Sequence, residues 1–369
     1  MSTIPIADPD VGPAAYDRIE SLLERGALAD GPEVRLFEDA FASYCETEHA
    51  VATSNGTTAL HATLEAVGVE PGDAVITSPF SFVASANAIR LAGGRPIFAD
   101  IEPETFTIDP AEVRRLCRRR EDVVGILPVH LYGCPARMEE LTEIADRRDL
   151  FVVEDACQAH GAAIDGTRVG GIGDAACFSF YPTKNMTTGE GGIVTTDDEA
   201  IAERVASYIN HGRRQTGDGE YDHVRLGHNH RMTAIAAAIG RRQLDRLPGF
   251  TESRREHAEY YDDHLAELPV TRPTVPDAFR HVYHQYTIRA PERDQLRETL
   301  ADADIETGVY YPTPIHQLPA YDAVHTAATE LPKAERAATE VLSLPVHPGL
   351  DTESCRRVVQ TIAAHYEET

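Results

Sequence analysis

Short apolar segments alternate with segments of helical periodicity through the first half of the chain, and this alternation restricts the fold more than any other feature. Extended segments are expected at residues 50–53, 73–77, 96–100, 123–129, 151–155, 175–180 and 193–196. Helical spacing of apolar residues occurs between several of them. The pattern predicts an α/β fold with a largely parallel sheet between helices. In such sheets, ligands bind just past the carboxyl ends of the strands.

The second half of the chain contains a sequence signal for a domain boundary. Helical periodicity at residues 233–247 is followed by Pro248 and Gly249, which we expect to end the helix. Ser253 and Glu256 form a capping-box pattern that predicts the start of another helix. At 369 residues the chain exceeds an average domain. The sequence therefore predicts a large domain with the sheet and a smaller α+β domain, over residues 1–248 and 249–369.

The chain is strongly acidic, with 60 Asp and Glu against 34 Lys and Arg, which gives a formal net charge of −26. Such a charge repels the phosphates of nucleic acids and anionic lipids, so we expect neither nucleic acid nor a membrane surface as a partner. Acidity of this degree, with arginine in place of lysine, indicates adaptation to high salt, where charge repulsion is screened. An ordinary acidic cytosolic protein is the alternative.

The spacing of the cysteines and the hydropathy of the chain exclude further classes of protein. The six cysteines form no C-x-x-C pair and show no regular spacing, which argues against a disulfide framework and a zinc ribbon. Residues 1–11 lack the basic and apolar regions of a secretory signal. No run of about 18 apolar residues occurs. We expect a cytoplasmic protein without a membrane span and without a bound metal.

Lysine is almost absent from the chain, and one of the two lysines lies in a polar, glycine-rich turn. Lys184 follows the extended segment 175–180, and Lys333 is the other lysine, against 32 arginines. An arginine stays protonated and cannot form an imine, whereas a lysine with a lowered pKa can. Lys184 is therefore predicted to be a Schiff-base lysine that binds pyridoxal phosphate. The alternative is a loop lysine that contributes only to solubility.

A second polar turn, before the helical segment 59–67, has the features of an anion site. Gly56, Thr57 and Thr58 lie where a helix begins, so backbone N–H groups and the positive end of the helix dipole face an anion there. The threonines add hydroxyl donors. Ser179, at the end of another extended segment, would add one more. Taken alone, this turn is also explained by a plain helix cap.

Three further residues match the remaining parts of the cofactor. Asp155 ends an apolar strand, and its carboxylate would keep the ring nitrogen of the cofactor protonated. Gln158 would hydrogen-bond the ring hydroxyl or pack on the ring, and Phe82 would stack on the ring face. For Asp155 the alternatives are a helix cap or an ion pair with an arginine. For Phe82 the alternative is an ordinary core aromatic.

Together these residues resemble the DegT/DnrJ/EryC1/StrS family of sugar aminotransferases that depend on pyridoxal phosphate. The resemblance extends from residue 31 to about residue 350. Each motif is modest alone, and their order and spacing are specific. They are SNGTTAL at 54–60, SFVAS at 81–85, PVHLYG at 128–133, EDACQAHG at 154–161, FSFYPTKN at 178–185, GEGG at 189–192, GHNHRM at 227–232, YPTPIH at 311–316 and LPVHP at 344–348.

The resemblance implies a role for each candidate residue. The fold would be that of the fold type I pyridoxal phosphate transferases, with a mostly parallel seven-stranded sheet. Lys184 aligns with the lysine that forms the imine and Asp155 with the aspartate at the ring nitrogen, and these two are the catalytic candidates. The cofactor-binding candidates are Gly56, Thr57, Thr58, Phe82, Asp155, Gln158, Ser179, Lys184 and Asn229.

The resemblance also implies a homodimer with shared active sites. Asn229 aligns with an asparagine that, in the family, reaches the phosphate of the neighbouring subunit's cofactor. His316 and Tyr311 fall near the sugar-nucleotide pocket and are the substrate-binding candidates, although His316 is equally explained as a surface or core histidine. Cys157 stands where alanine is commoner in the family, and its small size should not disturb the site.

The predicted activity is transamination in two half-reactions. L-glutamate would donate its amino group, and a nucleotide-linked 4-keto or 3-keto hexose would accept it, for polysaccharide or glycan biosynthesis. A branch of the family has histidine in place of the lysine and dehydrates the sugar, so Lys184 favours transamination. The alternatives are a fold type I aminotransferase that acts on an amino acid, and a non-catalytic cofactor-binding or regulatory homologue.

Overall fold

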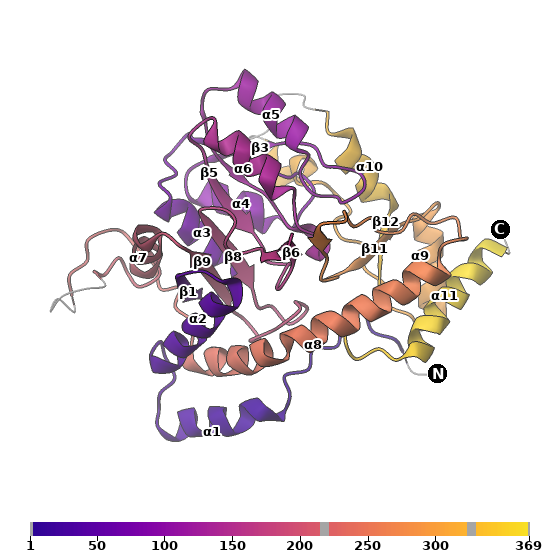
Figure 1. The fold of residues 1–369 in the computed structure, drawn as a ribbon, viewed down its shortest axis with the longest axis horizontal. Helices are drawn as coiled ribbons and strands as arrows, with labels where there is room; N and C mark the ends of the chain where they lie inside the picture. The colour runs from indigo at the N-terminus through magenta and orange to yellow at the C-terminus, as the bar shows by residue number, and fades with distance from the viewer. Residues whose placement is uncertain (1–2, 215–220, 323–329, 368–369) are drawn as a thin grey trace.

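The computed structural model describes residues 3–214, 221–322 and 330–367. Its centre is a seven-stranded sheet with the strand order β1-β9-β8-β5-β4-β2-β3 (Figure 1). All strands run parallel except β9, which is antiparallel to both of its neighbours. The predicted α/β class and the mostly parallel seven-stranded sheet are confirmed. The strands are β1 (His49–Thr53), β2 (Ala74–Thr77), β3 (Arg95–Phe98), β4 (Val123–Leu127), β5 (Phe151–Asp155), β8 (Ala175–Ser179) and β9 (Gly192–Thr196).

Helices cover both faces of this sheet, because successive side chains of each strand point to opposite faces. On β5, Val153 packs in the cluster with α3, α4 and α7, whereas Val152 packs in the cluster with α5 and α6. The helices α2 and α8 cover the rest of the second face. The bounds are α2 (Pro32–Cys45), α3 (Gly56–Ala66), α4 (Ala84–Leu91), α5 (Pro110–Arg119), α6 (Met138–Asp146) and α7 (Glu199–Tyr208).

The C-terminal part has its own small sheet and its own hydrophobic cluster. Tyr286 and Ile288 on one strand and Leu342 and Leu344 on the other are fully buried against α8 (Ala234–His264), α9 and α11. The strands β11 (Tyr286–Arg289) and β12 (Val341–Leu344) are antiparallel. The helices of this part are α9 (Arg293–Asp302), α10 (Pro332–Glu340) and α11 (Thr352–Glu367).

The remaining elements are short or peripheral. A three-stranded sheet of two-residue strands, in the order β10-β6-β7, joins the two parts of the chain. Helix α1 lies along the lower edge of the molecule in Figure 1. These elements are α1 (Tyr16–Glu24), β6 (Ala163–Ile164), β7 (Thr167–Arg168) and β10 (Phe279–Arg280), with 3₁₀ turns η1 (Pro13–Ala15), η2 (Leu131–Gly133), η3 (Ile315–Gln317) and η4 (Pro319–Tyr321).

One long helix, α8 (Ala234–His264), runs from beneath α2 to α11 (Figure 1). Pro248 lies inside this helix and does not end it. The prediction that Pro248 and Gly249 end a helix was therefore wrong, as was the capping box of Ser253 and Glu256, which both lie inside α8.

Tertiary packing explains why the helix continues past the proline. A proline inside a helix costs about 3 kcal/mol. Leu244 and Leu247, before the proline, are buried against the large sheet. Ala258, Tyr261 and Leu265, after it, are buried in the C-terminal cluster. Burial of each large apolar side chain contributes about 1.5–3 kcal/mol, which together exceeds the cost of the proline. The division at residue 248 stays a prediction, and α8 belongs to both sides of it.

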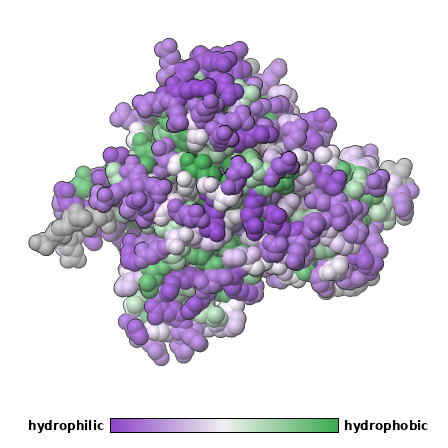
Figure 2. Space-filling model, in the orientation of Figure 1, coloured by the Kyte–Doolittle hydropathy of each residue, from purple (hydrophilic) through white to green (hydrophobic). Residues whose placement is uncertain are grey.

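The surface seen in Figure 2 is mostly hydrophilic, as the many charged residues of the sequence predict. Hydrophilic residues predominate on the face shown in Figure 2, and hydrophobic residues form small separate patches there. Among the helices of the described residues, none combines the length and the apolar character needed to cross a bilayer. The strands β1, β5 and β8 all end at the same edge of the sheet, which brings the polar turns after them together.

Candidate active site

A cavity of about 830 Å³ lies at this edge of the sheet. It collects most of the residues that the sequence singled out, from segments far apart in the chain. The candidates that line it are Gly56, Thr57, Thr58, Phe82, Asp155, Gln158, Ser179, Lys184 and Tyr311. The expectation that ligand-binding residues gather past the carboxyl ends of the strands agrees with this arrangement.

Helix α3 presents its N-terminus to the cavity. The Asn55 side chain caps the helix and accepts a hydrogen bond of 2.9 Å from the backbone N–H of Thr58. In return the Thr58 hydroxyl accepts the backbone N–H of Asn55 at 3.2 Å and donates to its carbonyl at 2.8 Å. The Thr58 hydroxyl is thus engaged in the cap, whereas no hydrogen bond among the described residues uses the Thr57 hydroxyl. The N-terminus with Thr57 is suited to a phosphate.

Gly56 is required by a close approach between α3 and β8. A Cβ atom at this position would lie 2.7 Å from the Ser179 Cβ atom and 3.0 Å from the Cys157 sulfur. Any larger residue would push the helix away from the strand. The absence of a side chain leaves the backbone N–H groups of the first turn next to the Ser179 hydroxyl. This cradle fits the phosphate of pyridoxal phosphate.

Asp155 is a buried carboxylate at the end of β5 with no basic partner among the described residues. Its Oδ2 atom accepts a hydrogen bond of 2.7 Å from the Ser85 hydroxyl, and its Oδ1 atom accepts one of 3.2 Å from the backbone N–H of Cys157. Only 4% of the residue is exposed. A buried charge without an opposite charge is costly. The arrangement therefore fits a ligand with a cationic group, such as the protonated ring nitrogen of pyridoxal phosphate.

Lys184 lies in the turn after β8, and three hydrogen bonds fix this turn. The backbone N–H of Lys184 donates to the Tyr181 carbonyl at 2.9 Å, and the Asn185 amide donates to the Val282 carbonyl at 3.0 Å. The backbone N–H of Thr187 donates to Gln243 at 3.1 Å. Desolvation in the cavity wall lowers the pKa of Lys184. Within the described residues its amine has no ion pair. A lysine in this state can lose its proton and act as a nucleophile.

Gln158 and Tyr311 form one hydrogen-bonded unit in the cavity wall. The Gln158 Oε1 atom accepts the backbone N–H of Tyr132 at 2.8 Å, and its Nε2 atom donates to the Tyr311 hydroxyl at 2.8 Å. Burial raises the pKa of Tyr311, so this hydroxyl stays protonated. The Phe82 ring is more than half exposed, and its centroid lies 6.4 Å from that of Tyr311. Its exposed face is available to a planar ligand.

Two candidates lie outside the cavity. Asn229 is exposed on the segment that follows α7 and forms a bridge with Asn210. His316 is buried, and its Nε2 atom lies 3.1 Å from a carboxylate oxygen of Glu335. The cofactor role of Asn229 and the substrate role of His316 stay predictions, and the placement of His316 gives its proposed role no support.

Other lining residues escaped the sequence analysis. Ser81, Tyr132, His284, Gln285 and Tyr310 contribute to the cavity. Ser81 and Tyr132 belong to recognised motifs, so their motif membership was an available signal. His284, Gln285 and Tyr310 come from the C-terminal half of the chain. Tyr310 directly precedes the motif at 311–316, whereas no local pattern at His284 and Gln285 points to the ends of the large sheet.

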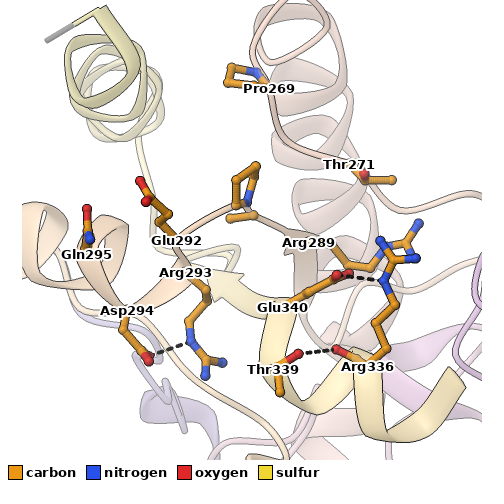
Figure 3. Close-up of a pocket in the computed structure, with 12 residues that line it drawn as sticks. Pro269, Thr271, Arg289, Glu292, Arg293, Asp294, Gln295, Arg336, Thr339 and Glu340 are labelled. Carbon is orange, nitrogen blue, oxygen red and sulfur yellow. Dashed lines mark hydrogen bonds and ion pairs between the residues drawn. The ribbon is translucent and has the colours of Figure 1, made fainter. Parts of the chain in front are cut away.

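A second cavity, of about 580 Å³, lies in the C-terminal part between α9, α10 and β11 (Figure 3). Its charged residues include two ion pairs, with Arg293 2.7 Å from Asp294 and Arg336 2.7 Å from Glu340. It contains none of the candidate residues. Over the described ranges, no group of three or more His, Cys, Asp and Glu side chains is arranged to hold a metal ion.

A mostly parallel sheet with a lysine, a buried carboxylate and a helix N-terminus at its carboxyl edge is the arrangement expected of enzymes that depend on pyridoxal phosphate. Within this class, the chain belongs to the DegT/DnrJ/EryC1/StrS aminotransferase family, whose family model matches residues 9–363. The resemblance seen in the motifs is thereby confirmed.

Two relatives of this chain are described in different ways, one as a regulatory protein and one as a transaminase. A pleiotropic regulatory protein of Geobacillus stearothermophilus is 43% identical over 94% of this chain and 93% of its own length. A dTDP-3-amino-3,4,6-trideoxy-alpha-D-glucose transaminase of Streptomyces venezuelae is 40% identical over 95% of this chain and 93% of its own length.

Solved structures agree with the fold throughout the chain. S. venezuelae DesV, in complex with a ketimine intermediate, is 37% identical, superposes with a TM-score of 0.93, and covers 100% of both chains. The PLP form of the sugar aminotransferase Spr1654 from Streptococcus pneumoniae is 28% identical with a TM-score of 0.93 and covers 99% of both chains. The family and this PLP form imply dependence on pyridoxal phosphate.

Proposed function

We propose that the protein is a sugar-nucleotide aminotransferase that uses pyridoxal phosphate. The observation that carries the proposal is the presence, in one cavity, of a desolvated lysine and a buried carboxylate, neither of which forms an ion pair among the described residues. A ligand with an electrophilic carbonyl and a cationic ring nitrogen would use both side chains.

Each part of the cavity wall has a task in holding this cofactor. The first turn of α3, with Gly56, Thr57 and the neighbouring Ser179, would bind the phosphate, and Asp155 would pair with the ring nitrogen. Phe82 would cover one ring face, and Gln158 would lie near the ring hydroxyl. Bound pyridoxal phosphate supplies the reactive carbonyl and an electron sink for the transfer of an amino group.

Lys184 has two tasks in the proposal. Its lowered pKa increases the share of neutral amine near neutral pH, and the neutral amine is the nucleophile that binds the cofactor. When a substrate amine is bound instead, the Lys184 amine would accept the proton from the substrate carbon and deliver it to the carbon of the cofactor's carbonyl group.

The substrates come to the proposal from the relatives. L-glutamate is the proposed amino donor, and a nucleotide-linked ketosugar, with the keto group at C3 or C4, is the proposed acceptor. The relatives of this chain include a dTDP-sugar transaminase, a GDP-perosamine synthase and a UDP-sugar 3-aminotransferase. Tyr311, whose protonated hydroxyl faces the cavity, is proposed to contact the acceptor sugar. The product would enter polysaccharide or glycan biosynthesis.

The proposal also includes an oligomeric state and a cellular location. Asn229 is exposed and lies outside the cavity of its own chain, which is compatible with a homodimer in which it reaches the partner's cofactor. The net charge of −26 supports a cytoplasmic protein adapted to high salt.

A second candidate, a regulatory protein that retains the fold, is favoured by one observation, the relative described as a pleiotropic regulatory protein. Against it, a chain that had lost catalysis would be free to lose Lys184 and Asp155, and both are retained in the cavity.

Absorbance spectroscopy separates the two candidates. The purified protein, supplied with pyridoxal phosphate, should acquire a visible absorption band, and L-glutamate should shift this band while 2-oxoglutarate is released. Amination is then measured across a panel of dTDP-, GDP- and UDP-linked ketosugars. Cofactor binding without any glutamate-dependent change would favour the regulatory candidate, and no cofactor binding would overturn the aminotransferase proposal.

A further inference from the structure

Two buried serines lie beside Asp155, and one of them, Ser81, also lines the cavity. Ser81 lies in the loop after β2, and Ser85 lies in the first turn of α4; they are 3% and 1% exposed. Their hydroxyl oxygens are 3.0 Å apart, and the Ser85 oxygen is 2.7 Å from Asp155 Oδ2. The three side chains thus form a continuous hydrogen-bonded chain from α4 to the end of β5.

The direction of this chain follows from the number of hydrogens. An ionised carboxylate only accepts hydrogen bonds, so the single hydroxyl hydrogen of Ser85 is donated to Asp155. The Phe82 carbonyl competes for the same hydrogen, but at 3.3 Å it is the more distant acceptor. The hydrogen between the two serines must then come from Ser81. Both hydroxyl dipoles point toward the carboxylate, and each strengthens the next.

The two oxygens of Asp155 are held from two directions. Ser85 holds Oδ2, and the backbone N–H of Cys157 holds Oδ1 at 3.2 Å. These two contacts fix the plane of the carboxyl group. Hydrogen bonds to a charged acceptor are also stronger than those between neutral groups, so they favour the ionised form.

We propose that Ser85, supported by Ser81, is a positioning residue that holds the Asp155 carboxylate in its orientation toward the ring nitrogen of the bound cofactor. The inference rests on the proposed function, because it requires pyridoxal phosphate in this cavity. Ser85 acts through Asp155 and has no contact of its own with the reacting atoms. Without its hydroxyl, Asp155 loses one of two fixed contacts and holds the proton on the ring nitrogen less strongly.

The test reads the protonation of the ring nitrogen directly. Wild-type protein and Ser85→Ala are loaded with pyridoxal phosphate carrying ¹⁵N in the ring, and the ¹⁵N chemical shift is recorded. The wild type should give the shift of a protonated ring. Ser85→Ala should move toward the shift of a neutral ring and bind the cofactor about tenfold more weakly, which corresponds to the loss of one hydrogen bond to a charged group. Ser85→Thr, which retains the hydroxyl, should restore both values.

Ser343→Ala is the matched control. Ser343 is fully buried in β12 and shares a hydrogen bond of 2.8 Å with Thr287, and neither residue lines the cavity. Ser343→Ala should lower the melting temperature of the cofactor-free protein as Ser85→Ala does, without changing the ¹⁵N shift of the cofactor ring. If the alanine variant does not fold, Ser85→Cys, of similar size and with a weak donor, should give an intermediate shift.

Two results would overturn the inference in distinguishable ways. A ¹⁵N shift and cofactor affinity unchanged in Ser85→Ala or Ser85→Cys, in a protein that binds the cofactor and releases 2-oxoglutarate, would remove Ser85 alone. A wild-type protein that does not bind the cofactor would remove the proposed function together with this inference.

Discussion

Glu154 and Asp155 are neighbours at the end of β5 and both are buried, but the partners of their charges differ. Glu154 accepts a hydrogen bond from His130 at 2.9 Å and others from the backbone N–H groups of Gly170, Ile172 and Gly173. Asp155 receives one hydroxyl and one backbone N–H and faces a cavity.

The difference between these neighbours separates a structural charge from a functional one. On the Glu154 side, every hydrogen bond joins one part of the protein to another, so the carboxylate fastens the loops of residues 130–136 and 170–173 to the sheet. On the Asp155 side, the carboxylate remains open to a ligand. A buried charge whose partners are all within the fold stabilises that fold, whereas one that faces a cavity predicts a ligand of opposite charge.

The strongest test of the cavity on the Asp155 side is to remove its only lysine. Lys184→Ala should abolish transamination, with a loss of at least about 10³-fold, because no other lysine lines the cavity and the nucleophile is lost. Turnover is measured as 2-oxoglutarate released from L-glutamate in the presence of a ketosugar acceptor.

Lys333→Ala is its matched control, since it removes the only other lysine. The Lys333 amine lies 2.8 Å from Asp109, outside the cavity lining. Its loss should leave turnover within about twofold, because exposed ion pairs contribute about 0–1 kcal/mol. Turnover that persists in Lys184→Ala would exclude this lysine from the mechanism.

Exchanging the two neighbouring acids for their amides should give opposite results. Asp155→Asn should lower turnover by about 10²–10³-fold, as expected when one preorganised electrostatic contact is lost. Its melting temperature without cofactor should hardly change, because Asp155 has no basic partner among the described residues. Kinetics and thermal unfolding of the same preparation check both statements.

Glu154→Gln should mainly reduce stability. Loss of one partner of a buried, bonded charge costs about 3 kcal/mol, and the amide cannot accept all four hydrogen bonds with its NH₂ end. Chemical denaturation measures the loss. If Glu154→Gln retained the wild-type free energy of unfolding but lost turnover, the assignment of the two acids would be reversed.

A third pair of variants compares a glycine of the phosphate cradle with a glycine of α8. Gly56→Ala should destabilise the protein by about 1–3 kcal/mol and weaken cofactor binding, because the new methyl group would overlap Ser179. Gly249→Ala, inside α8 with no atom within 4 Å of the new methyl group, should instead stabilise it by up to about 1 kcal/mol. Equal effects at both positions would contradict the close approach of α3 to β8.

The sequence predicted the parts of the site that follow directly after strands. Lys184, Asp155 and the turn at Gly56 come at strand ends, and the periodicity that marks the strands also marks these positions. The sequence did not reveal that the Thr58 hydroxyl is used by the helix cap, because this depends on the side chain of Asn55.

The errors came from long-range packing. Pro248 has a strong local tendency to end a helix, but apolar contacts on both sides of it keep α8 continuous. His284 and Gln285 reach the cavity through the tertiary fold alone. His316 packs beside Glu335, and its substrate role stays a prediction.

The smallest expected effect is the pH dependence of the Glu154 contribution. Burial raises the pKa of Glu154, but the hydrogen bonds from His130, Gly173 and Gly170 outweigh it and hold the pKa below the usual glutamate value. A carboxylate whose pKa is lowered by folding stabilises the native state fully above its unfolded pKa, and this contribution disappears as the pH falls through its folded pKa. The difference in free energy of unfolding between wild type and Glu154→Gln should therefore be constant near neutral pH and shrink below about pH 4.3, the usual glutamate value. Denaturation at a series of acidic pH values measures it, and a difference that grows on acidification would mean that Glu154 is protonated in the native protein.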